Sequence, residues 1–179
     1  MKWTTALCPL VLALSACVAQ AAGLELKKGD HICIIGNTLA ERMQHDGWLE
    51  TLIHARFPQH ELVFRNLGYS ADEIELSKRL RSMDFGTPDQ WLAGNAPVPQ
   101  PNKLSPKDEV PENRFEGTNT RADVIFAFFG YNESFAGEAG LAKFKQDLEA
   151  FLKHTLAQKY NGTSPPRLVL FSPDRKSVV

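Results

Sequence analysis

The sequence is poor in cysteine. Only three cysteines occur in 179 residues, and two of them, Cys8 and Cys17, lie near the N-terminus in an apolar leader. Loss of that leader would leave Cys33 alone, so neither a disulfide framework nor a CxxC metal pair is expected. Cys33 sits inside an apolar run, where a small buried side chain is the expected role.

An excess of charge and a long hydrophobic run are also missing. The chain has 20 Lys and Arg against 21 Asp and Glu, which leaves no basic surface for nucleic acid or an anionic membrane. The apolar stretch from Ala6 to Ala19 is shorter than the roughly 20 residues that span a bilayer. Histidines and carboxylates do not recur at metal-ligand spacing, so neither a metal nor a cofactor is expected.

The N-terminus has the features of an export signal. Lys2, the apolar stretch and Ala19-Gln20-Ala21 are typical of a cleaved signal peptide over residues 1–22. Leu14-Ser15-Ala16-Cys17 also resembles a bacterial lipobox, which would leave a lipid anchor on Cys17, and an uncleaved anchor is a third reading. Each reading predicts an exported bacterial protein, periplasmic or extracellular.

The remaining chain alternates between two hydrophobic periods. Short apolar runs at 31–36, 61–68, 122–130 and 167–172 predict strands, and segments at 39–57, 71–83 and 139–159 predict helices. This alternation predicts one α/β domain over residues 29–173, with a parallel sheet between two helical layers. The strongest helical pattern is an apolar stripe in 139–159, formed by Leu141, Phe144, Leu148, Phe151, Leu152 and Leu156.

Two helix starts carry capping-box patterns, and one loop is long. Thr38 with Glu41, and Ser70 with Glu73, fit Ser/Thr-x-x-Glu boxes that would begin the first two helices. The Pro-rich segment 84–121 is predicted to be a loop, either an exposed excursion or a lid over a substrate. Asn161-Gly162-Thr163 is interpreted as a turn rather than a glycosylation acceptor.

Polar residues follow the first three predicted strands. The segments are "GNT" at 36–38, "NLGYSAD" at 66–72 and "GYNES" at 130–134. In an open parallel sheet the carboxyl ends of the strands form the usual ligand site, so these segments are expected to meet.

In their order and placement these segments resemble the sequence blocks of SGNH (GDSL-like) hydrolases, which have a flavodoxin-like three-layer α/β/α fold. The resemblance implies carboxylic ester hydrolysis, with acylated carbohydrate among the candidate substrates. It places Thr38 at the nucleophile, with Asn37 in place of the usual Asp, and Ala71 at a glycine that donates its backbone N–H, with Gly68 as the alternative. Asn132 falls on the asparagine of the oxyanion hole.

A second resemblance is to a more specific group of proteins, and it covers longer stretches of the sequence. Residues 29–52, 79–92 and 122–144 are similar to the N-terminal region of PVC-type haem-binding CxxCH proteins, whose haem motif lies far downstream. This chain contains no such motif, so no cofactor is implied for it.

The departures from the SGNH pattern leave activity open. The γ-methyl of Thr38 restricts its side-chain torsion, and the Asp-x-x-His block that would supply the base is missing. None of the five histidines fits that block; they are His31, His45, His54, His60 and His154. The fold is therefore expected to be incomplete at its C-terminus, with a tail at 174–179, and the chain alone to be inactive. The alternative is a non-catalytic binding or scaffolding module, and no pattern indicates an oligomeric state.

Overall fold

The computed structural model describes residues 23–75, 77, 87–94 and 120–173. The predicted leader at 1–22 and the tail at 174–179 lie outside the described residues, as do most of segment 84–121 and most of the predicted second helix.

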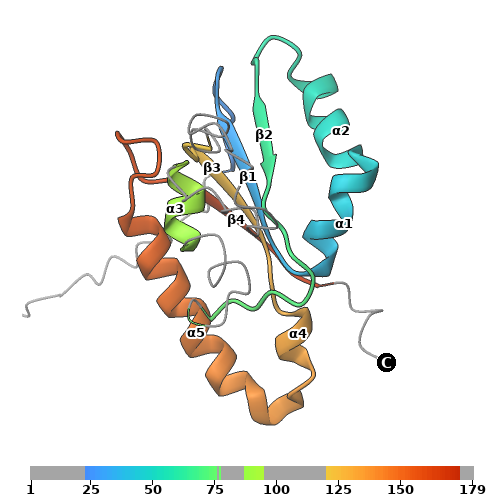
Figure 1. Ribbon diagram of the computed structural model, residues 1–179, viewed down its shortest axis with the longest axis vertical. Coiled ribbons are helices and arrows are strands. Elements are labelled where there is room, and N and C mark those ends of the chain that lie inside the picture. The colour runs from blue at the N-terminus through green and yellow to red at the C-terminus, as the bar shows by residue number, and fades with distance from the viewer. Residues whose placement is uncertain (1–22, 76, 78–86, 95–119, 174–179) are drawn as a thin grey trace, which may run out of the picture.

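The centre of the fold is a sheet of four parallel strands (Figure 1). The strands are β1 (His31–Gly36), β2 (Val63–Asn66), β3 (Val124–Phe128) and β4 (Arg167–Phe171), in the order β2-β1-β3-β4. Each neighbouring pair is parallel, and Ile34 of β1 lies beside Asn66 of β2 and Phe126 of β3. This order is that of a flavodoxin-like sheet, and it confirms the predicted α/β class.

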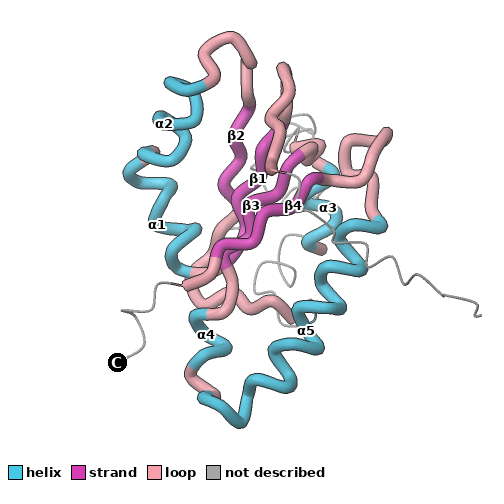
Figure 2. Tube along the Cα trace, turned by 180° about the vertical axis from the view of Figure 1, so that it is seen from behind, coloured by secondary structure: helices cyan, strands magenta, loops and turns pink. Residues whose placement is uncertain are grey.

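Side chains along the central strands alternate between the two faces of the sheet, so a hydrophobic core forms on each face. Ile32 and Ile34 of β1 face one side of the sheet, while Cys33 and Ile35 face the other, and all four are buried. The first side is covered by α1 (Thr38–Asp46) and α2 (Trp48–Arg56). The second side is covered by α5 (Gly137–Ala157) and the short α3 (Pro88–Ala93) (Figures 1 and 2). The predicted three-layer arrangement is therefore present.

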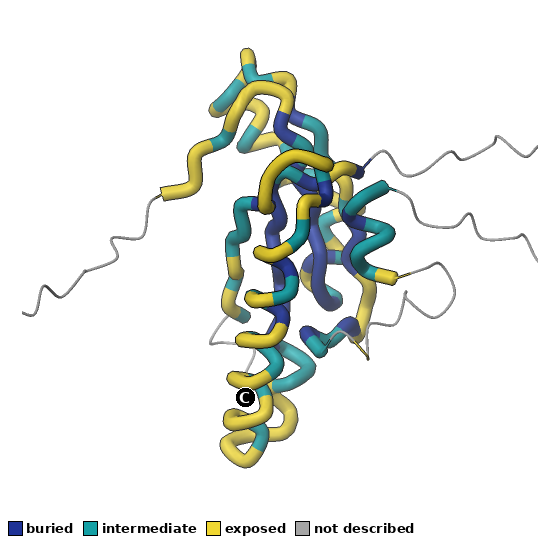
Figure 3. Tube along the Cα trace, turned by 90° about the vertical axis from the view of Figure 1, so that its left-hand side faces the viewer, coloured by how far each residue is buried: buried dark blue, intermediate teal, exposed yellow. Residues whose placement is uncertain are grey.

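The predicted apolar stripe of the long helix α5 is buried in the middle of the helix and exposed at its two ends. Phe151 is fully buried, and Phe144, Leu148 and Leu152 pack against the same core. Leu141 and Leu156, at the two ends of the stripe, are exposed instead. Figure 3 shows this outward face of α5 beside the buried strands.

Three predictions about helices were wrong in detail. The helix expected over 39–57 is two helices. Gly47 has φ 59° and ends α1, and its N–H donates to the carbonyl oxygen of Met43. No helix begins at Ala71, which lies in a turn with φ 64°, so the Ser70 capping box does not form. Segment 84–121 contains α3, whose capping box is formed by Thr87 and Gln90.

Other expectations for single residues hold. Cys33 is buried, and burial, with a smaller contribution from Asp123, raises the pKa of its thiol. Asn161 lies in a turn, where its side-chain oxygen accepts from Thr163 N and Ser164 N.

Within the described residues, no helix is both long and apolar enough to cross a membrane.

Candidate functional site

The first part of the site is the turn from β1 into α1. Gly36 has φ 130°, and a Cβ there would lie 2.1 Å from the Phe128 carbonyl oxygen, so only glycine fits. Asn37 follows, and its N–H donates to the same Phe128 oxygen at 3.0 Å. Its side-chain oxygen accepts from Leu39 N at 3.3 Å, which makes Asn37 the N-cap of α1.

This geometry corrects the predicted capping box at Thr38. Thr38 is the first residue of α1 rather than its cap. Glu41, the expected box partner, accepts from the Ser70 hydroxyl at 3.2 Å and lies 3.5 Å from His45 Nε2. The Thr38 side chain is half-buried, and its hydroxyl forms no hydrogen bond with a described residue.

The second part is the segment after β2. Tyr69 N donates to the Gly36 oxygen at 2.9 Å, which carries the chain alongside the β1–α1 turn. Gly68 packs directly on α1, since a Cβ there would lie 2.6 Å from Glu41 N. Ala71 then adopts φ 64°, a backbone region that favours glycine. This is the position at which the resemblance places a family glycine.

The third part is the turn from β3 into α4 (Tyr131–Ser134). The Glu133 carboxylate accepts from Gly130 N at 2.9 Å through one oxygen and from Ile74 N at 2.7 Å through the other. Asn132 Nδ2 donates to the Asp72 oxygen over a long 3.5 Å. Glu133 thus ties the third segment to the second with both of its oxygens.

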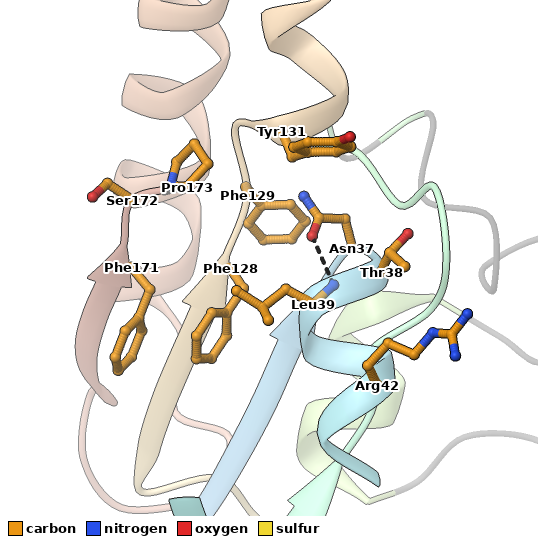
Figure 4. A pocket seen from close by; sticks show the side chains of 10 residues that line it. All are labelled: Asn37, Thr38, Leu39, Arg42, Phe128, Phe129, Tyr131, Phe171, Ser172 and Pro173. Atoms are coloured by element: carbon orange, nitrogen blue, oxygen red, sulfur yellow. Dashed lines mark hydrogen bonds between the residues drawn. The ribbon is translucent and has the colours of Figure 1, made fainter. Parts of the chain in front are cut away.

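A pocket of about 710 Å³ opens at the carboxyl ends of β1, β3 and β4 (Figure 4). Its described lining is aromatic and apolar on one side and polar at the α1 corner. The lining residues are Asn37, Thr38, Leu39, Arg42, Phe128, Phe129, Tyr131, Phe171, Ser172 and Pro173. The pocket lies between β1 and β3, where the strand order reverses, which is the expected ligand position in such sheets.

The three predicted site residues do not share this pocket. Thr38 lines it, whereas Ala71 and Asn132 are not among its described lining residues. Ala71 and Asn132 are associated with each other instead, because the Asn132 amide reaches the carbonyl of the residue that follows Ala71.

The described histidines do not supply a base to Thr38. His31 Nδ1 lies 2.8 Å from the Thr120 oxygen, and His154 Nε2 lies 2.8 Å from Asp89. His45 contacts Glu41, and the rings of His54 and His60 pack on Phe64 and Phe57. Within the described residues, no group of three His, Cys or carboxylate side chains could hold a metal ion.

Sequence reasoning missed the functional interest of several residues. It assigned no role to Glu133, and it did not select Arg42, Phe171 or Pro173. The position of Glu133 three residues after a glycine that follows a strand is a capping signal, which could have indicated its contact with Gly130. No local sequence pattern predicts that Phe171 lines the same pocket as the start of α1, because their proximity depends on the order of the strands in the sheet.

Comparison with known proteins shows a fold relationship only. No family model matches the chain, and no curated protein matches it. Among solved structures, a gut microbial diltiazem-metabolizing enzyme is similar, with 15% sequence identity and a TM-score of 0.50. The match covers 82% of this chain and 27% of that one, so the chain spans about a quarter of that structure. The chain therefore shares an α/β fold with an enzyme.

Proposed function

We propose that the chain is an SGNH-type ester hydrolase domain whose reacting ester carbonyl binds beside Thr38, at the carboxyl ends of the strands. The observation that carries the proposal is the meeting of the three polar segments at one end of the sheet. Hydrogen bonds join the segment after β2 to the β1–α1 turn, and Glu133 joins it to the turn after β3. The α/β fold, which the chain shares with a diltiazem-metabolizing enzyme, is compatible with such a domain.

The proposed reaction is acyl transfer. The Thr38 oxygen attacks the ester carbonyl while a base takes the hydroxyl proton; the alcohol leaves with a proton, and water then hydrolyses the acyl-enzyme. Negative charge on the carbonyl oxygen is stabilised by the N–H groups of Thr38 and Ala71 and by the Asn132 amide, each typically contributing about 3 kcal/mol in such sites. Asn132 would have to exchange its long contact with Asp72 for the substrate oxygen.

The base is the part of the proposal that the described residues do not supply. The SGNH resemblance would place it in an Asp-x-x-His block, which the described residues do not contain. Without such a base the chain is expected to show no turnover above buffer. We further propose that the protein is exported to the bacterial periplasm or cell exterior, with or without a lipid on Cys17. A position within a PVC-type haem-binding protein, and acylated carbohydrate as substrate, remain predictions from the resemblance alone.

The test is hydrolysis of p-nitrophenyl acetate and acetylated sugars by this chain and by the longest form that the gene encodes. Thr38→Ala is expected to reduce turnover to the buffer rate, and Asn132→Ala to reduce kcat by roughly 100-fold or more. Glu149→Ala, on the exposed face of α5, is the control and should be unchanged. Equal turnover by the wild type and both site variants would refute hydrolysis at this site.

A non-catalytic binding module is the second candidate. The observation that favours it is the position of Thr38, whose hydroxyl has no base beside it among the described residues. This candidate predicts ligand binding in the pocket without turnover in any form of the protein.

A further inference from the structure

Asn37 presents a side-chain donor to the pocket. The residue is 3% exposed, and its Oδ1 atom accepts from Leu39 N at 3.3 Å. Because the oxygen must face this N–H, the Nδ2 group faces the other way, toward Tyr131 and the pocket (Figure 4). None of the described residues accepts a hydrogen bond from Nδ2. Because Nδ2 is not one of the fully buried atoms that lack a partner in the described residues, it is open to the pocket, where a ligand oxygen can accept from it.

The start of α1 adds further donors at the same place. Thr38 is the first residue of a nine-residue helix, so its N–H has no partner within the helix. Its hydroxyl also lines the pocket. The first turn of a helix carries partial positive charge, which favours an anionic oxygen there.

The charged side chain among the described lining residues of the pocket is positive. Arg42 is the single side chain there that is charged at neutral pH, and no carboxylate lines the pocket. Its Nε lies 3.8 Å from Glu41, and its side chain is 73% exposed at the rim. Glu41 also accepts from the Ser70 hydroxyl and lies 3.5 Å from His45 Nε2.

The opposite wall is apolar and flat. Phe128 and Phe171 stack with ring centroids 4.2 Å apart and planes 12° apart, and Leu39 points toward them. Such a wall favours an aromatic or branched apolar body and offers few partners to a sugar.

We propose that the pocket binds a carboxylate attached to a flat apolar body, and that Asn37, rather than Asn132, supplies the side-chain donor to its oxygen. One carboxylate oxygen accepts from Asn37 Nδ2 and the other from Thr38. If the proposed hydrolase function holds, this ligand is the acid product of an aryl or branched acyl ester. The binding itself needs no base and can be tested on the chain alone.

The experiment is an NMR titration of the ¹⁵N-labelled chain with benzoate, with benzamide and acetate as comparators. Benzoate is expected to shift the amide signals of residues 37–40, while benzamide, which lacks the charge, and acetate, which lacks the ring, bind more weakly. Asn37→Asp keeps the cap of α1, since Asp caps as well as Asn. It removes the donor and adds a negative charge, so benzoate affinity should fall about tenfold or more.

Two further variants sharpen the test. Arg42→Gln should weaken benzoate about two- to fivefold, as for an exposed ion pair. Gln59→Glu adds the same charge as Asn37→Asp at an exposed turn beyond α2, and should leave binding unchanged. Unshifted signals at 37–40, or an Asn37→Asp variant that binds benzoate as tightly as the wild type, would overturn the proposal.

Failure of this inference is distinct from failure of the proposed function. Benzoate binding that is lost in Asn37→Asp, with no ester turnover in any form, would uphold the carboxylate site and reject the hydrolase. Ester turnover that requires Thr38, with benzoate binding independent of Asn37, would do the reverse.

Discussion

Removal of the Glu133 carboxylate should weaken the structure that holds the site together. Its two oxygens accept from Ile74 N at 2.7 Å and Gly130 N at 2.9 Å, and these partners come from segments far apart in the sequence. A hydrogen bond to a charged group contributes about 1.5–3 kcal/mol. Because Glu133 is half-buried, the lower value applies to each bond, and Glu133→Ala should lower the free energy of unfolding by about 3 kcal/mol.

Urea unfolding followed by circular dichroism measures this change, and amide hydrogen exchange locates it. Exchange at Ile74 and Gly130 should accelerate in Glu133→Ala. Glu133→Gln keeps one acceptor oxygen and turns an NH₂ group toward the other N–H, so one of the two amides should still lose protection. Glu149→Ala, on the exposed face of α5, should change stability by less than about 0.5 kcal/mol. A Glu133→Ala variant as stable as the wild type, with both amides still protected, would refute the reasoning.

Three further predictions follow from single positions. Gly36→Ala should cost about 3 kcal/mol or more in thermal unfolding, because its Cβ would meet the Phe128 oxygen, whereas Gly29→Ala, also at positive φ but in open space, should cost about 1 kcal/mol. Burial raises the pKa of the Cys33 thiol, so peptide mapping should find it unmodified by a disulfide reagent at pH 8 and modified once urea unfolds the chain. In a hydrolytically active form, Thr38→Ser should raise kcat by roughly tenfold, since loss of the γ-methyl eases attack; an equal or lower kcat would count against Thr38 as nucleophile.

The sheet could be predicted because its central strands carry their own signal. The stretches 32–36 and 124–130 contain only apolar residues and glycine, as expected for strands buried on both faces, and the structure places β1 and β3 there. The edge strands were predicted too long: 61–68 exceeds β2 by four residues, and 167–172 exceeds β4 by one.

The helix errors have a backbone cause. Gly47 and Ala71 both adopt positive φ, and the apolar pattern around them continues as though the helix did too. The apolar pattern at 39–57 therefore predicted one continuous helix where the chain breaks at Gly47. The pattern from Ala71 predicted a helix where the chain forms a turn. Competing caps caused the error at Thr38, because Asn37 and Thr38 are both good N-caps and only the structure shows that Asn37 takes that place.

The candidate site was predictable in position and less so in detail. The carboxyl ends of parallel strands meet, so the association of the three polar segments followed from strand order. The direction of the Asn132 amide, the Glu133 contacts and the aromatic wall from Phe171 depend on tertiary packing. Local sequence therefore does not predict these contacts.

The most direct test of the account is whether Thr38 acts as a nucleophile in the longest form of the protein that the gene encodes. A fluorophosphonate ester reports this, because an attacking hydroxyl forms an oxygen–phosphorus bond and releases fluoride. Mass spectrometry is expected to find one adduct, on the peptide that contains Thr38, and none in Thr38→Ala. An unmodified Thr38 peptide in a form that hydrolyses p-nitrophenyl acetate would contradict the account.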